Sequence, residues 1–181
     1  ADNWAITAAC WQNRRVGRHI VTTAVEHSAV IECCRWLERQ GYEVTYVAPD
    51  ANGEITAEQI LSAVRPDTAV VSCMMVNNEL GNVYPIAEIA AGLSARNAQT
   101  LLHTDAVQGF LKIPFAAKSL GADFITISAH KIGGPKGIGA LYVRRKPRVR
   151  IEPQIHGGGH ERGMRSGTLA THQIVGMGEA Y

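Results

Sequence analysis

The chain has 181 residues, 46% of them apolar, and its 18 basic and 16 acidic side chains give a formal net charge of +2. This length and apolar content can bury one sizeable core, which excludes a disordered chain and makes one folded domain the expectation. The near balance of charge argues against a surface built for nucleic acid. A basic cluster at residues 144–150 is interpreted as a solvated loop. Its alternative, a docking surface for an acidic partner or nucleic acid, lacks interleaved aromatic residues.

The cysteines and the hydropathy of the chain indicate the cellular compartment in which the protein is expected. The four cysteines form neither a CxxC pair nor a regular disulfide framework, which favours a reducing compartment. No apolar stretch approaches the roughly 20 residues that span a bilayer, and the first residues do not resemble a signal peptide. We therefore predict a cytoplasmic protein with no membrane partner. An organellar matrix stays open, because the chain has no initiator methionine and both of its ends read as cut.

The first half of the chain alternates between helical and strand patterns. It predicts, in order, an opening helix already under way, a strand at residues 19–22, a helix at about 29–38, a strand at 43–47, a helix at about 57–64 and a strand at 68–76. Thr56 and Gln59 resemble a capping box at the start of the third helix. The last segment is apolar on both faces, as expected of a central parallel strand that helices cover on each side.

The second half continues the alternation. It predicts a helix at 86–93 opened by Pro85, a strand that ends at Asp105, and strands at 123–127 and 140–143. The fold class is therefore α/β, a mostly parallel sheet with helices on both faces. Ligands of such sheets gather outside the carboxyl ends of the strands. Asn78, Asp105 and Lys131 follow successive strands, so we expect them to converge on one crevice.

Lys131 is the most informative of these residues. A lysine at a strand end is either a surface charge or an amine in a partly desolvated pocket, where it becomes nucleophilic towards a carbonyl. Ser128 and His130 beside it can hold an anion, and the glycines that follow let the backbone approach a ligand. A lysine and an aspartate on separate strand ends suit pyridoxal phosphate (PLP), with Asp105 paired to the pyridinium nitrogen.

Five segments, in matching order, resemble the class V branch of the fold type I PLP-dependent enzymes, and the cysteine desulfurases in particular. They are residues 25–27, 76–81, 103–108, 128–131 and 156–168. The resemblance runs the whole length of the chain. It implies that residues 1–181 form part of a PLP-binding large domain, with an N-terminal segment and a C-terminal small domain absent.

The resemblance also implies roles around the PLP ring. Lys131 would be the catalytic lysine that forms the Schiff base and moves protons, and Asp105 would lie on the pyridine nitrogen. Asn78 and Gln108 would lie near the ring hydroxyl. His27 would stack on the ring face as a second catalytic residue. From first principles, Asn78 can instead form a turn, Asp105 can cap a helix, and Gln108 can face solvent.

Further roles concern the phosphate and the partner subunit. By the resemblance, Ser128 and His130 would bind the phosphate within one subunit. Thr168 would reach the phosphate of the partner subunit, so the resemblance implies a homodimer. The nucleophilic cysteine and the arginine that holds the substrate carboxylate would both lie beyond Tyr181. From the residues alone, the serine and threonine can equally be turn hydroxyls bonded to backbone.

Two other ligand sites are weighed and rejected. The glycine-rich tract at residues 133–139 lacks the Gly-Lys-Ser/Thr ending of a nucleotide phosphate loop and is followed by a strand pattern. His156, His160 and Glu161 are plausible zinc ligands by type, but three glycines separate the histidines and no helical face aligns them. We predict no metal.

The function that the resemblance implies is conversion of L-cysteine to L-alanine, with persulfide sulfur passed to an iron–sulfur scaffold or another acceptor. The segment at residues 156–168 favours this reaction. The alternatives are another class V enzyme, such as a selenocysteine lyase or an aminotransferase, and a non-catalytic interaction module. The isolated chain is expected to be inactive.

Overall fold

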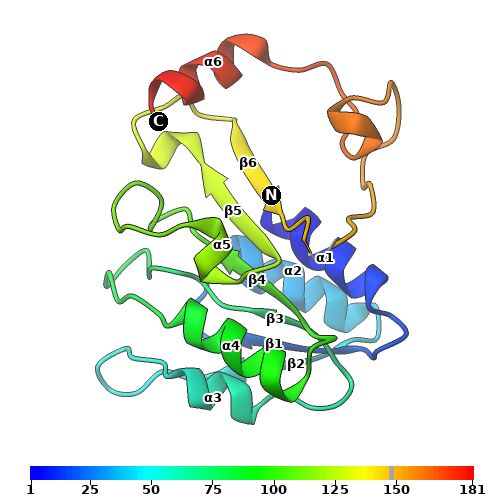
Figure 1. Cartoon of the computed structure of the whole chain (residues 1–181), viewed down its shortest axis with the longest axis vertical. Helices are drawn as coiled ribbons and strands as arrows, with labels where there is room; N and C mark the ends of the chain where they lie inside the picture. The colour runs from blue at the N-terminus through cyan, green and yellow to red at the C-terminus, as the bar shows by residue number, and fades with distance from the viewer. Residues whose placement is uncertain (147–148) are drawn as a thin grey trace.

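A computed structural model describes residues 1–146 and 149–181 (Figure 1). A six-stranded sheet in the order β2-β1-β3-β4-β5-β6 forms the centre of this part of the chain. Its strands are β1 (His19–Thr23), β2 (Glu43–Val47), β3 (Thr68–Ser72), β4 (Leu101–Asp105), β5 (Phe124–Ser128) and β6 (Gly139–Val143). The first five are parallel and β6 is antiparallel to β5, so the predicted mostly parallel sheet is confirmed. Residues 147 and 148 of the basic cluster lie outside the described residues.

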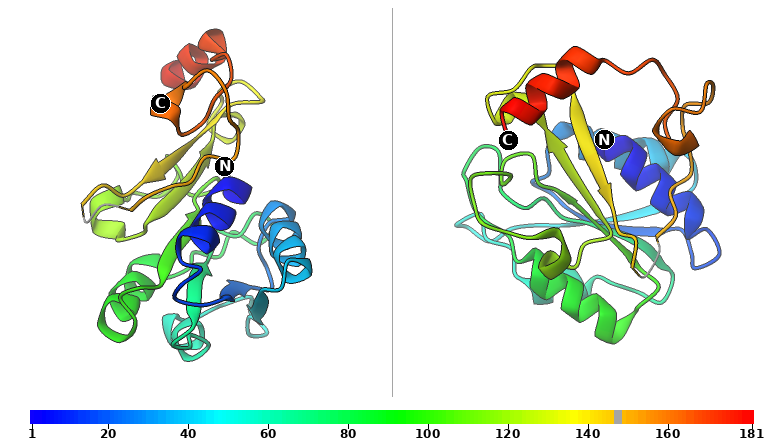
Figure 2. Two further views of the ribbon diagram at one scale, coloured as in Figure 1. Left: turned by 90° about the vertical axis from the view of Figure 1, so that its right-hand side faces the viewer. Right: turned by 45° about the horizontal axis from the view of Figure 1, so that its top comes forward.

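Helices cover both faces of the sheet, as predicted (Figures 1 and 2). Helices α1 (Asp2–Gln12) and α2 (Ser28–Arg39) lie on one face; α3 (Ala57–Ser62), α4 (Ile86–Arg96) and α5 (Ala117–Leu120) lie on the other. Neighbouring residues of one strand point to opposite faces. In β3, Val70 therefore packs in the α1–α2 core and Val71 in the α3–α4 core.

Helix α6 (Thr171–Glu179) lies near the loop between β5 and β6, separate from both cores. Its Gln173 amide donates to the Lys136 carbonyl at 2.8 Å. The contact joins α6 to the loop between β5 and β6.

The predicted strand at 68–76 is too long, because β3 ends at Ser72. Beyond that point the chain still bonds to β4: the amide of Cys73 donates to the His103 carbonyl and that of Met75 to the Asp105 carbonyl. On the other side, β1 has already turned away towards α2. The amide of Met74 donates there to the carboxyl group of Glu26. The apolar run marks a buried segment, but only the neighbouring chain decides where the strand ends.

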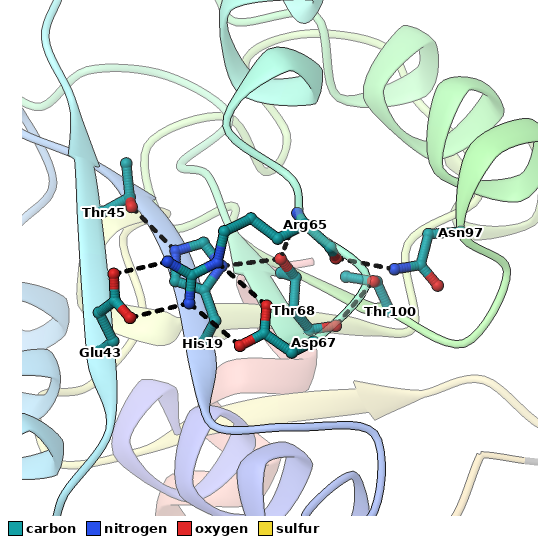
Figure 3. A network of polar contacts seen from close by, with 8 residues as sticks. All are labelled: His19, Glu43, Thr45, Arg65, Asp67, Thr68, Asn97 and Thr100. Atoms are coloured by element: carbon teal, nitrogen blue, oxygen red, sulfur yellow. Dashed lines mark hydrogen bonds and ion pairs between the residues drawn. The ribbon is translucent and has the colours of Figure 1, made fainter.

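Polar contacts tie β1, β2 and β3 together at their amino ends (Figure 3). The buried ring of His19 bonds to the hydroxyl groups of Thr68 at 2.7 Å and Thr45 at 2.8 Å. Arg65 forms bidentate contacts with Glu43, at 2.5 and 2.9 Å, and with Asp67, at 3.0 and 3.1 Å. This network lies at the edge of the sheet opposite the predicted crevice, so its role is structural.

We expect Thr68→Val to destabilise the fold more than Arg65→Ala does. The Thr68 hydroxyl also accepts the Arg65 amide at 2.7 Å, so valine leaves two buried polar groups unpaired, at a cost of about 2 kcal/mol. The Arg65 side chain is 38% exposed, and its ion pairs are screened by solvent, so their loss should cost less than the loss of the Thr68 hydroxyl. Urea unfolding of both variants measures the order; a larger loss in Arg65→Ala would contradict it.

Candidate active site

A cavity of about 1160 Å³ opens at the carboxyl ends of the parallel strands. Its lining includes every residue that the sequence singled out: His27 after β1, Asn78 after β3, Asp105 and Gln108 at and after the end of β4, Ser128 at the end of β5, His130 and Lys131 in the 3₁₀ helix η1 (Ala129–Lys131), and Thr168 before α6. The predicted convergence on one crevice is therefore found. The roles of these residues towards a cofactor stay predictions.

Asp105 is the most buried of these side chains, with 6% of its surface exposed. One carboxylate oxygen accepts the Val107 amide at 2.9 Å. Burial raises the pKa of Asp105, and the negative charge of Asp2 raises it further. The hydrogen bond from Val107 lowers that pKa by less. A carboxylate in this position gains stability from any cationic group that enters the cavity.

Asp2 lies in the first turn of α1, where it lines the same cavity. Its carboxylate is 3.5 Å from Nε2 of His103, whose ring also bonds to the hydroxyl groups of Ser72 and Thr126. Burial raises the pKa of Asp2, but the contacts with His103, the N-terminal ammonium and Thr126 together lower it by more, so the net shift is downward. The sequence assigned no role to Asp2, since an acid in a first helical turn is common without any site.

His27 caps the amino end of α2. Its Nδ1 accepts the Ala29 amide at 3.1 Å, which leaves the proton of the neutral ring on Nε2. The same ring lines the cavity, so capping α2 does not remove it from the site.

Ser128 and His130 contact each other, with the serine hydroxyl 2.8 Å from Nδ1 of the ring. The pair presents a hydroxyl and an imidazole to the cavity beside Lys131, whose side chain is exposed to solvent. Among the described residues, nothing shields the Lys131 side chain from water. Thr168 also lines this cavity of its own chain, so its reach to a partner subunit stays a prediction.

Comparison with known proteins identifies the family. The chain matches the aminotransferase class-V family over residues 1–181. The chain belongs to the class V aminotransferase family.

Its relatives in this class V family include cysteine desulfurases. The cysteine desulfurase IscS of Aeromonas hydrophila is 59% identical over all 181 residues, which make up 44% of that protein. A solved NifS-like protein matches with a TM-score of 0.93 and 41% identity, over 99% of this chain and 48% of that one. SspA, solved in complex with cysteine, matches with a TM-score of 0.92 and 41% identity, over 99% and 51%. The chain thus spans about half the length of the relatives it matches.

The donor set of the cavity fits the cofactor that the class V family implies. An amine at Lys131 suits the aldehyde of PLP, and a buried carboxylate at Asp105 suits its pyridine nitrogen. The imidazole of His27 suits an aromatic ring face, and the Ser128–His130 pair suits a phosphate. No group in this set repels the part of PLP that it would meet.

Glu26 is a further polar residue that the sequence left without a role. It is buried directly before His27, and burial raises its pKa from an ordinary 4.5 to about 8. The only sequence feature that points to Glu26 is an acidic residue in the mostly apolar turn after a strand. That signal does not tell a buried carboxyl group from an exposed one.

We expect the carboxyl group of Glu26 to make stability depend on pH. Its pKa is higher folded than unfolded, so its contribution is fully present below about pH 4.5 and is lost as pH rises through about 8. The free energy of unfolding of the wild type, minus that of Glu26→Gln, should fall across this window by up to about 5 kcal/mol. Urea unfolding from pH 4.5 to 8.5 measures it; a constant difference would contradict the prediction.

None of the helices within residues 1–146 and 149–181 is long and apolar enough to cross a membrane. In that same part of the chain, no three His, Cys, Asp or Glu side chains lie together as a metal site would require. The expectation that His156 and His160 hold no metal stays a prediction.

Proposed function

We propose that the chain is the PLP-binding part of a cysteine desulfurase, with the flanking segments of the large domain and the small domain outside residues 1–181. The observation that carries this proposal is the convergence of Lys131, Asp105 and the other predicted ligands on one cavity. Similarity to cysteine desulfurases along the whole chain supports the reaction. The cysteine held by the SspA relative supports L-cysteine as the substrate.

Each residue of the cavity would then have a defined task. Lys131 would hold the cofactor through its amine and carry the proton that leaves and returns at the substrate α carbon. Asp105 would keep a proton on the ring nitrogen, and bound PLP supplies the electron sink that this arrangement requires. His27 would orient the ring, Asn78 and Gln108 would bond to its hydroxyl, and Ser128 with His130 would hold the phosphate.

The nucleophile that takes the sulfur is expected outside this chain. Cys10, Cys33, Cys34 and Cys73 are all buried, and burial raises the pKa of each thiol, to about 12 for Cys33. A thiol must ionise to attack sulfur, so a buried cysteine with a raised pKa is a poor nucleophile. This observation supports a mobile cysteine beyond Tyr181, as in the family that the sequence resembles.

The wider assembly is part of the proposal. It comprises a homodimer in which Thr168 reaches the phosphate of the partner subunit. Persulfide sulfur would pass to an iron–sulfur scaffold or another acceptor. Reduced, buried cysteines support a cytoplasmic location, with an organellar matrix as the alternative. Equilibrium sedimentation with and without PLP tests the dimer.

A chimera tests the proposed reaction. The 181 matching residues of Aeromonas hydrophila IscS would be replaced by this chain. The chimera then keeps the remaining segments of IscS. With a thiol reductant present to release the persulfide sulfur as sulfide, we expect the chimera to form alanine and sulfide from L-cysteine, and the same chimera with Lys131→Ala to form neither. A chimera that binds PLP yet releases only selenium from selenocysteine, or only transfers amino groups, would assign a different class V reaction. One that binds no PLP would favour an interaction module.

A further inference from the structure

Two loops that carry predicted ring ligands are bonded to each other through Glu26. Its Oε1 atom accepts the hydroxyl group of Thr23, at 2.9 Å, and the amide of Met74, at 2.7 Å. Thr23 ends β1, and Met74 lies beyond the end of β3. The carboxyl group therefore replaces the strand partner that β3 loses where β1 turns away.

Asn77 makes a second bond between the same two loops. Its side-chain Nδ2 donates to the Val25 carbonyl at 3.2 Å. Its side-chain Oδ1 accepts the backbone amides of Glu79 and Leu80. Both Glu26 and Asn77 are buried, with 7% of each residue's surface exposed. Each comes directly before an exposed residue of the cavity, His27 or Asn78.

The bonded loops are also attached to the strand that carries Asp105. The Met75 amide, next to the residue that Glu26 binds, donates to the Asp105 carbonyl at 2.8 Å. These hydrogen bonds thus connect Glu26, which precedes His27, and Asn77, which precedes Asn78, to the backbone of Asp105. A shift at Glu26 would move the first of these relative to the other two.

We propose that Glu26 is a positioning residue that fixes His27 relative to Asn78 and Asp105. This inference rests on the proposed function in one respect, namely that these residues are held in place to surround one PLP ring. The arrangement itself is a property of the chain without cofactor.

The surroundings of Glu26 favour the neutral form. Burial raises its pKa most, the hydrogen bonds from Met74 and Thr23 lower it by less, and the negative charges of Asp105 and Asp2 raise it further. The other titratable groups around it are the thiols of Cys34 and Cys73 and the hydroxyl of Tyr84. Among the described residues, no salt bridge reaches Glu26. Ionisation at high pH would place a charge without an ion-pair partner in this buried position and change the loop contact.

Three variants separate positioning from simple stability. Glu26→Ala removes the acceptor, whereas Glu26→Gln keeps a carbonyl oxygen for Met74 and cannot ionise. Asp123→Asn is the control at a buried carboxyl group that does not line the cavity: Asp123 lies directly before β5, accepts the strand amide of Leu102 at 2.8 Å and, unlike Glu26, also pairs with Arg144. The readout is the ring signal of His27 in NMR spectra of the chain labelled with ¹³C-histidine, assigned by its loss in His27→Gln.

We expect Glu26→Ala to move the His27 signal, and Glu26→Gln and Asp123→Asn to leave it in place at pH 7. In the wild type the signal should show a step near pH 8, and Glu26→Gln should lack this step. If Glu26→Ala does not fold, the step decides alone. An unmoved signal in folded Glu26→Ala, an equal shift in Asp123→Asn, or a step near pH 8 that persists in Glu26→Gln would overturn the inference.

PLP binding gives a second readout and separates the two proposals. Followed by visible absorbance at pH 7, PLP affinity should fall roughly tenfold in Glu26→Ala and stay within about threefold in Glu26→Gln and Asp123→Asn. Equal affinities in wild type and Glu26→Ala would also overturn the positioning role. If the wild type shows no absorbance that depends on Lys131, the proposed function fails for this chain, and the NMR result still decides the role of Glu26.

Discussion

Lys131→Ala is expected to abolish the visible absorbance band that the chain develops with PLP. Among the described residues, Lys131 is the one lysine that lines the cavity with the buried carboxylate of Asp105. A covalent link to the cofactor aldehyde needs an amine, so alanine removes the link completely, and arginine at this position should not restore it. Absorbance titration with PLP from pH 7 to 9 measures the loss.

Lys136→Ala is the matched control for this experiment. Lys136 lies five residues further on in the same loop, its side chain does not line the cavity, and only its carbonyl contacts α6. We expect the band of this variant to match that of the wild type. A band that survives in Lys131→Ala, or is lost in Lys136→Ala, would place the attachment elsewhere.

Asp105→Asn is expected to change stability and PLP affinity in opposite directions. Because the pKa of Asp105 is higher folded than unfolded, its contribution to stability is present below its ordinary value of 3.8 and is lost as pH rises through the folded value. At pH 7 the asparagine variant should therefore unfold at higher urea than the wild type without PLP. Asparagine can still accept the Val107 amide.

The loss of the charge should weaken PLP binding by about a hundredfold. An amide cannot pair with a protonated ring nitrogen, and truncating one partner of a buried charge pair typically costs 2–5 kcal/mol. Isothermal titration with PLP and urea unfolding with and without PLP measure the two effects. Asp123→Asn controls for the loss of a buried carboxylate away from the cavity. Unchanged PLP affinity in Asp105→Asn would remove Asp105 from the site.

The main features of the fold could be predicted from local patterns. The capping box of Thr56 and Gln59 forms as expected, with both reciprocal hydrogen bonds present, because its partners are three residues apart. The helices on both faces follow from strands that are apolar on both sides. The end of β3 at Ser72 could not be predicted, because it depends on where β1 diverges.

Some residues of the candidate site could likewise be predicted from the sequence, and others could not. Strand ends bring Asn78, Asp105 and Lys131 together in any parallel sheet of this type, so their convergence was predictable. Glu26 and Asp2 were not, because burial of an acid depends on distant contacts. Met74, the amide partner of Glu26, lies 48 residues along the chain. Thr168 comes from a loop whose course no local pattern indicates, and only the family resemblance singled it out.

The most direct test of the central claim is to find the residue that carries the cofactor. The chain would be mixed with PLP at a one-to-one ratio, reduced with borohydride and digested, and each modified lysine identified by mass spectrometry. We expect the modification on Lys131 alone, and its loss when Asp105→Asn weakens binding. Modification spread over exposed lysines such as Lys112, Lys118 and Lys136, with Lys131 no more reactive than the others, would contradict a PLP site at the carboxyl ends of these strands.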